Sequence, residues 1–262
     1  MRRIAGAPHL IRVTDYPFLV FFVSFFALWL STWVGRALRR PGKLDSQSRE
    51  DFAVVVPATL TILGLIIGFT FSMAVSRYDQ RKHYEELEAG AIGTEYLRAD
   101  LLPAAEASQV RTLLRSYLEE RIRFYTIHDA RQLQQISGET LRLQNKLWSA
   151  EQTPAAAPPN PLMALAIAGM NDVSNAAGSA QAAWWNRIPD AAWILMALIA
   201  ILSNLVIGYG VLQREFLSIP PLVLPLVVSI SLLLIADIDS PRGGVIRVAP
   251  HNLLSLADSL RQ

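Results

Sequence analysis

The chain has 262 residues, of which 52% are hydrophobic, and its mean hydropathy is +0.30, a composition typical of a membrane protein. A formal net charge of +2 and the lack of any basic arm or RNA-binding motif give no support for nucleic-acid binding. The absence of cysteine excludes disulfides and thiolate chemistry, and the scattered histidines have no metal-ligand spacing, so no metal or cofactor is predicted.

Four apolar segments are long enough to cross a bilayer, because a hydrocarbon core of about 30 Å needs roughly 20 apolar residues in a helix. Tryptophans lie near one end of the first segment and near the start of the third, where amphipathic rings favour the membrane interface. The sequence therefore predicts a multi-pass protein surrounded by lipid. The predicted spans are residues 17–34, 52–75, 191–212 and 219–236.

The basic residues outside the spans give the orientation. Cytoplasmic termini place most arginines and lysines inside, although the basic loop 36–49 then lies outside, against the positive-inside rule. We favour an inner-membrane protein whose N-terminus, C-terminus and soluble domain are cytoplasmic.

The second span continues directly into a charged segment. No proline or turn signal separates the apolar run from SRYDQRKHYEELEAGAIGTE, so the sequence predicts one continuous helix over 53–95. Such a helix leaves the membrane and can transmit a conformational change in the bilayer to a domain outside it. This favours a channel or a membrane-coupled signalling protein.

The polar region 76–187 is predicted to be a soluble helical bundle. Charges at helical spacing, such as Arg81 with Glu85 and Lys82 with Glu86, indicate an exposed helix face. A proline-rich linker at 153–161 breaks the region. An apolar stripe predicts the bundle core, and its members are Val110, Leu113, Leu114, Tyr117, Leu118, Phe124 and Tyr125.

These elements predict an all-α fold with four transmembrane helices and a soluble helical bundle inserted between the second and third spans. The predicted domains are a first transmembrane hairpin over 1–75, the soluble domain over 76–187, a second hairpin over 188–237 and a C-terminal tail over 238–262.

Few residues are candidates for a catalytic or ligand-binding role. No P-loop, GxSxG, GxGxxG or HExxH motif is present, so the sequence does not predict an enzyme. Asp237 and Asp239, before a turn-forming SPRGG, could bind a cation, but a helix end at the headgroups explains them better. Asn171 and Asp172 make a polar patch that a solvated face explains better than an ion or partner site.

The second span has the features of a pore helix. It carries no formal charge, which argues against a proton relay or an ion-coupled transporter and is compatible with a channel gated by a hydrophobic constriction. Gly64 and Gly68, with Thr61 and Ser72, give one small-residue face for close helix packing.

Several long phrases of the chain resemble a bacterial membrane-protein family called bestrophin-like. They are GLIIGFTFSMAVSRYDQRK, EAGAIGTEYLRADLLP, RIP before the third span and ADIDSPRGGVIRV after the fourth. The resemblance runs from the DYP at Asp15 to the final HNLLSLADSL. It implies membership of a family whose function is poorly characterised.

The second span also resembles that of true bestrophins, which are pentameric anion channels. Their Gly-Phe, apolar run and Ser/Thr-Arg-aromatic pattern matches Gly68-Phe69 and the membrane-exit segment Ser76-Arg77-Tyr78. The resemblance implies a homo-oligomer, a pentamer by analogy, that passes chloride or another small ion. The apolar neck of bestrophins matches Thr61, Leu65 and Phe69.

Two departures from bestrophins matter. Thr61 is polar where bestrophins are apolar, which predicts a shorter constriction. The acidic calcium-binding run after the fourth span is missing, so calcium gating is not predicted.

Three hypotheses follow. The leading one is an oligomeric ion channel lined by the second span. The alternative is a non-conducting scaffold or sensor whose cytosolic helices bind a partner protein, with the stripe from Val110 to Tyr125 partly exposed. A membrane enzyme, built around Asn171, Asp172, Asp237 and Asp239, has the least support.

Overall fold

The computed structural model describes residues 13–39, 46–155, 161–210 and 220–261. Every regular element in these ranges is a helix and none is a strand, which confirms the all-α prediction. The chain divides into two compact units. Unit 1 comprises Met1–Ser76 and Arg187–Arg247, and unit 2 comprises Arg77–Asn186 and Val248–Gln262.

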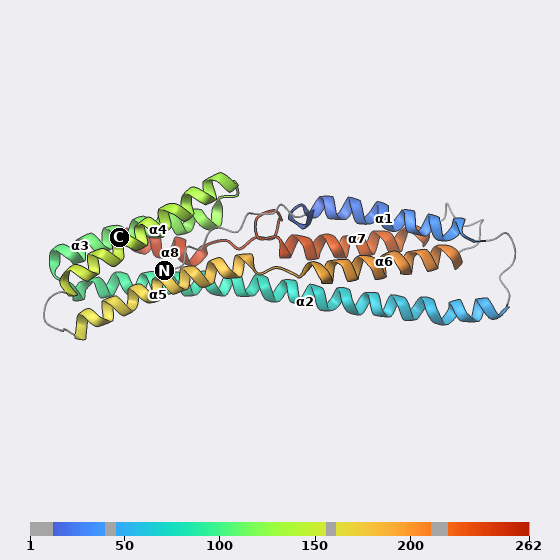
Figure 1. Ribbon diagram of the computed structural model, residues 1–262, viewed down its shortest axis with the longest axis horizontal. Helices are drawn as coiled ribbons and strands as arrows, with labels where there is room; N and C mark the ends of the chain where they lie inside the picture. The colour runs from blue at the N-terminus through green and yellow to red at the C-terminus, as the bar shows by residue number, and fades with distance from the viewer. Residues whose placement is uncertain (1–12, 40–45, 156–160, 211–219, 262) are drawn as a thin grey trace. The chain divides into compact units, whose positions relative to one another are not determined.

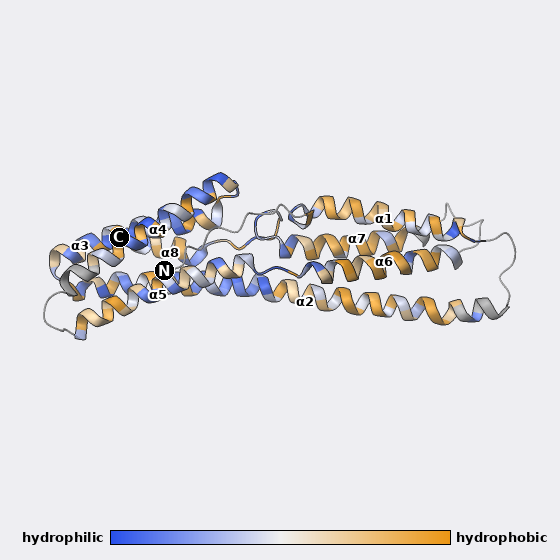
Figure 2. Ribbon diagram, in the orientation of Figure 1, coloured by the Kyte–Doolittle hydropathy of each residue, from blue (hydrophilic) through white to orange (hydrophobic). Residues whose placement is uncertain are grey.

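Helix α2 (Ser46–Arg98) contributes to both units and has no break, as its sequence predicted. It ends in a short 3-10 turn (Ala99–Leu101), after which Pro103 precedes the next helix. Figure 2 shows its change in character, from hydrophobic in the first half to hydrophilic in the second. The backbone thus stays helical through Pro57 and through the change from apolar to charged side chains.

Unit 1 contains the apolar helices, which Figure 1 shows side by side. They are long and apolar enough to cross a membrane, so the protein is membrane-embedded. The predicted span residues 211–212 and 219 lie outside the described ranges. Besides the first part of α2, unit 1 contains α1 (Pro17–Ala37), α6 (Asp190–Gly210) and α7 (Pro220–Asp239).

Helices α1 and α6 pack in direct backbone contact. A Cβ atom added to Gly35 would collide with the carbonyl oxygen of Leu205, and one added to Gly208 would collide with that of Thr32. The hydroxyl of Ser31 donates a hydrogen bond across the same contact to the carbonyl of Ile201, at 2.7 Å. Small residues that let two backbones approach are typical of helix pairs in membranes.

Unit 2 is a bundle of antiparallel helices around one hydrophobic core. The predicted apolar stripe is buried in it: Val110, Leu114 and Tyr117 are fully covered. The stripe is therefore core and does not form the exposed binding surface that the scaffold hypothesis requires. Besides the second part of α2, the helices are α3 (Ala104–Thr126), α4 (Ala130–Ala155), α5 (Pro161–Trp185) and α8 (His251–Ser259).

Helix α4 extends through Ala155, so it includes the first residues of the predicted linker, and α5 begins at Pro161. The linker residues 156–160 lie outside the described ranges.

Candidate functional site

Within unit 1, helix α2 buries only a narrow stripe. Leu63, Thr70 and Ala74 are buried and follow one another at helical spacing. The most apolar 18-residue window of α2 is 6% buried, whereas that of α7 is 50% buried. Most of the α2 surface in the membrane therefore has no partner within the described part of the chain.

The three neck residues lie on the side of α2 opposite that stripe. Thr61 is exposed, as are Leu65 at 55% and Phe69 at 66%. Each residue advances the helix by about 100°, which brings the three onto one face, turned away from Leu63. The Thr61 hydroxyl donates to the carbonyl of Pro57 at 2.8 Å, so its donor is satisfied within its own helix.

Gly64 and Gly68 border the same face. A Cβ atom added to either would meet nothing within 4 Å among the described residues. The close helix packing predicted for them is therefore not seen among the described residues and stays a prediction. In the described part of unit 1, the close contacts between helix backbones are instead made by Gly35 and Gly208, two isolated glycines that no sequence pattern singled out.

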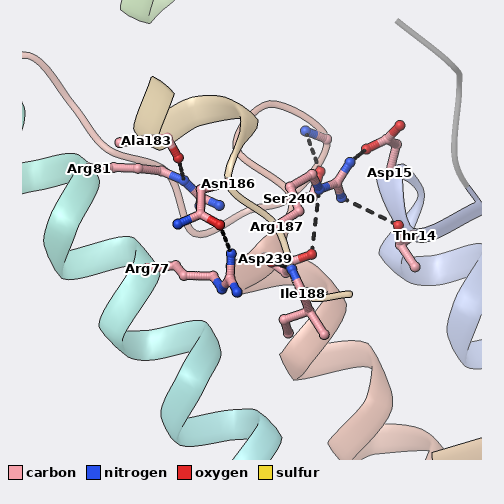
Figure 3. Close-up of polar contacts among 11 residues, drawn as sticks. Thr14, Asp15, Arg77, Arg81, Ala183, Asn186, Arg187, Ile188, Asp239 and Ser240 are labelled. Carbon is pink, nitrogen blue, oxygen red and sulfur yellow. Dashed lines mark hydrogen bonds and ion pairs between the residues drawn. The ribbon is translucent and has the colours of Figure 1, made fainter. Parts of the chain in front are cut away.

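At one end of the unit 1 helices, Arg187 joins three segments that are far apart in the sequence (Figure 3). Its guanidinium forms an ion pair with Asp15, before α1, and lies 3.4 Å from a carboxylate oxygen of Asp239, at the end of α7. The other carboxylate oxygen of Asp239 accepts the backbone N–H of Ile188 at 3.0 Å. The DYP, RIP and ADIDSPRGG phrases thus meet in one cluster, named here the Arg187 clasp (Asp15, Arg187 and Asp239).

The turn after α7 is closed by Asp237. Its two carboxylate oxygens accept the backbone N–H groups of Val245 and Ile246, at 2.7 and 2.8 Å. Gly243 is required in this turn because a Cβ atom there would collide with the carbonyl oxygen of Asp15. Among the described residues, Asp237 and Asp239 therefore anchor backbone and arginine groups, and cation binding there stays a prediction.

The other candidate polar residues lie in unit 2. Asp172 is exposed and lies 3.7 Å from the Arg98 guanidinium, while Asn171 is exposed beside it on α5. A solvated face explains both. In the part of the chain that the structure describes, no group of three or more histidine, aspartate or glutamate side chains is arranged to hold a metal ion.

The membrane-exit segment connects to unit 2 through its arginine. Arg77 donates a hydrogen bond to the side-chain oxygen of Asn186, and Arg81, one turn later, donates to the carbonyl of Ala183 at 3.4 Å (Figure 3). Tyr78 packs against the unit 2 core, while Ser76 is exposed. Arg77 and Tyr78 thus help to hold α2 in unit 2.

Arg81 and Glu85 correct a prediction. Their spacing indicated an exposed helix face, but each is only 1% exposed. Glu88 and Glu95 continue the same side of α2 and are also buried. The i, i+4 pattern finds a charged pair but does not tell which side of the helix faces the core.

Glu88 is the centre of a buried charged network. Its carboxylate pairs with the guanidinium of Arg121 and accepts the Tyr125 hydroxyl at 3.1 Å. Burial alone would lower the pKa of Arg121, but the neighbouring Glu88 carboxylate raises it above its ordinary value. Burial raises the pKa of Tyr125, and the charge of Glu88 raises it further. The charge of Arg121 is thus stabilised in the core by its contact with the Glu88 carboxylate.

The fold and the α2 face together define a helical multi-pass membrane protein with one largely uncovered span. Its fold is that of bacterial bestrophin homologues. A crystal structure of one from Klebsiella pneumoniae, a point variant, matches with a TM-score of 0.63 at 12% sequence identity, over 92% of this chain and 93% of that one. A second structure of a Klebsiella pneumoniae homologue, phased with zinc, matches with a TM-score of 0.59 at 12% identity, over 91% and 95%.

The family is shown by the sequence itself. The model of the bestrophin-like domain matches residues 20–253, and the chain belongs to this bestrophin-like family. No protein with a curated description matches it. The resemblance seen in the sequence phrases is thus confirmed.

Proposed function

We propose that this protein is a homo-oligomeric ion channel whose pore is lined by α2 and narrowed by rings of Thr61, Leu65 and Phe69. The observation that carries the proposal is the uncovered α2 face: two large apolar side chains are exposed opposite the stripe that the chain buries. Copies arranged around a common axis would cover that face. The resulting apolar rings suit a gate that works by excluding water.

The assembly proposed is a pentamer, by analogy with bestrophins. Gly64 and Gly68 would contact the neighbouring copy, because nothing in the described chain approaches them. Unit 2 would extend the conduit on the cytoplasmic side of the inner membrane as a helical domain inserted between the second and third spans. The permeant species would be chloride or another small ion.

Ion flux from liposomes tests the proposal. Leu65→Ala and Phe69→Ala widen the constriction, so each should raise flux several-fold over wild type. Phe71→Ala is the matched control, because Phe71 is also exposed but lies on another side of α2. Exchanging chloride for a large anion, and sodium for a large cation, then identifies the ion that passes.

Two outcomes would contradict the channel proposal. One is the absence of flux from wild type and from the Leu65→Ala, Phe69→Ala double variant alike. The other is a monomeric mass by native mass spectrometry, since a single copy encloses no pore.

A further inference from the structure

Helix α8, which ends the described chain, has no capping side chain of its own. Its N-cap residue is Pro250, whose side chain offers no hydrogen-bond acceptor. A helix that spans only His251–Ser259 is too short to be stable by itself in water, and its first N–H groups need acceptors from elsewhere.

Glu85 of α2 supplies one such acceptor, while the carbonyl of Ala249 accepts the N–H of His251. One of the Glu85 carboxylate oxygens accepts the backbone N–H of Leu253 at 3.0 Å, and the other accepts the side-chain amide of Asn252 at 2.6 Å. Glu85 is 1% exposed, so water does not compete for these bonds. A carboxylate is well suited to this place, because the N-terminus of a helix carries partial positive charge.

The remaining attachment of α8 is hydrophobic. Leu253 is fully buried, and Leu256, Ala257 and Leu260 pack against the unit 2 core. Gly93 of α2 lies under Leu256, where an added Cβ atom would be 3.2 Å from the leucine methyl. A short helix held by one buried charged contact and one apolar row is the kind of element that opens as a unit.

We propose that Glu85 and α8 form a latch. Helix α8 docks on α2 and α3 when Glu85 caps it and detaches when the cap is lost, and docking fixes the rotation of α2 about its own axis. Since α2 also carries Leu65 and Phe69, detachment of α8 alters ion passage; this second step rests on the proposed function. Glu85 acts through α2 and is a positioning residue.

The test compares Glu85→Gln with Glu86→Gln in the full-length protein in lipid nanodiscs. The first substitution keeps the size of the side chain and removes its charge. The second does the same at the neighbouring residue, whose side chain is 69% exposed. Backbone hydrogen exchange is measured for residues 251–260 of the C-terminal segment and for residues 110–118 of α3. We expect exchange in α8 to be about tenfold faster in Glu85→Gln, with α3 unchanged and Glu86→Gln like wild type.

A second variant, Asn252→Ala, removes one of the two contacts from the α8 side and should accelerate α8 exchange by a smaller factor. Unchanged α8 exchange in both Glu85→Gln and Asn252→Ala overturns the latch. Equal acceleration in α8 and α3 also overturns it, since Glu85 would then support the whole core.

Flux measured on the same variants decides the second step. If Glu85→Gln frees α8 and flux changes at least about threefold, latch and channel are coupled. If α8 is freed and flux equals that of wild type, the coupling is wrong. If no variant and no wild-type sample conducts, the channel proposal fails, while hydrogen exchange still decides the latch.

Discussion

Between their helices, units 1 and 2 accommodate buried polar groups in different ways, while the buried charge of the Arg187 clasp lies at the helix ends of unit 1. In unit 1, the helix contacts use hydroxyl and amide groups: Ser31 bonds the backbone of α6, and the Thr32 hydroxyl lies 3.3 Å from the Asn204 side-chain oxygen. In unit 2, the buried groups on α2 are charged, and Glu88 with Arg121 forms an ion pair inside the core.

The difference follows from the forces that pack the helices of each unit. Lipid is as apolar as leucine, so helices in a membrane associate through close backbone contact and hydrogen bonds, which the Gly35 and Gly208 contacts provide. Unit 2 has a large core of leucine, valine and aromatic side chains, which can accommodate a charged pair if both partners are present. Unit 1 should therefore be sensitive to added volume, and unit 2 to removed charge.

Arg121→Ala should have the largest effect. It leaves Glu88 as an uncompensated carboxylate in the core, which costs about 3–5 kcal/mol of unfolding free energy in buried pairs. Chemical denaturation of the full-length protein in detergent measures the loss. Arg142→Ala is the control: Arg142 is 60% exposed and pairs with Glu139 at the surface, so a much smaller loss is expected. Equal losses would contradict the role of the buried pair.

Gly35→Ala should have the next largest effect. The added methyl meets the Leu205 carbonyl oxygen, and overpacking of this kind costs about 1–3 kcal/mol. Thermal unfolding in detergent detects it. Gly64→Ala separates packing within the protomer from packing between copies. It should leave the protomer as stable as wild type, but it should weaken the assembly if Gly64 contacts another copy. A stable Gly35→Ala protein would show that the α1–α6 contact can relax.

Alkaline pH should lower the folding stability of unit 2, and the loss should grow gradually as pH rises. Burial raises the pKa of Tyr117, which ordinarily lies near 10, so the folded state holds this proton more tightly than the unfolded state. The stabilisation is complete below pH of about 10 and is lost as pH rises above it. Tyr117→Phe removes the titrating group and should flatten the fall in stability above that pH, as measured by denaturation at a series of pH values. A slope equal to that of wild type would exclude Tyr117 as its source.

Asp15→Asn should have the smallest effect. It weakens one arm of the Arg187 clasp, while Asp239 keeps the other. Asp15 is 31% exposed, so a loss of about 1 kcal/mol or less is expected. Thermal unfolding compared with Asp258→Asn, a change in an exposed surface pair, measures it. A loss as large as that of Arg121→Ala would mean that the clasp holds unit 1 together.

The sequence was sufficient for features that depend on local pattern. The continuous α2 follows from the lack of a proline or turn signal between its apolar and charged parts, and the buried α3 stripe follows from apolar spacing. It was insufficient where partners are distant in the chain. The pairing of Glu88 with Arg121, and the meeting of Asp15 with Arg187 and Asp239, have no local period to reveal them. Gly64 and Gly68 likewise have the spacing of a helix-packing motif, whereas Gly35 and Gly208 have none. The contact of Gly35 and Gly208 exists only once α1 and α6 meet.

The helix α2 also limits how this sequence can change in length. Its buried residues repeat on one face, from Leu63 through Ala74 and Arg81 to Glu95. One inserted residue turns everything downstream by about 100°, which would bring exposed side chains to the face that is now buried. Insertions or deletions of seven residues restore the face to within about 20°. Eleven or eighteen residues restore it equally well or better, so relatives that differ in the length of this helix should differ by about a whole number of turns and not by one or two residues.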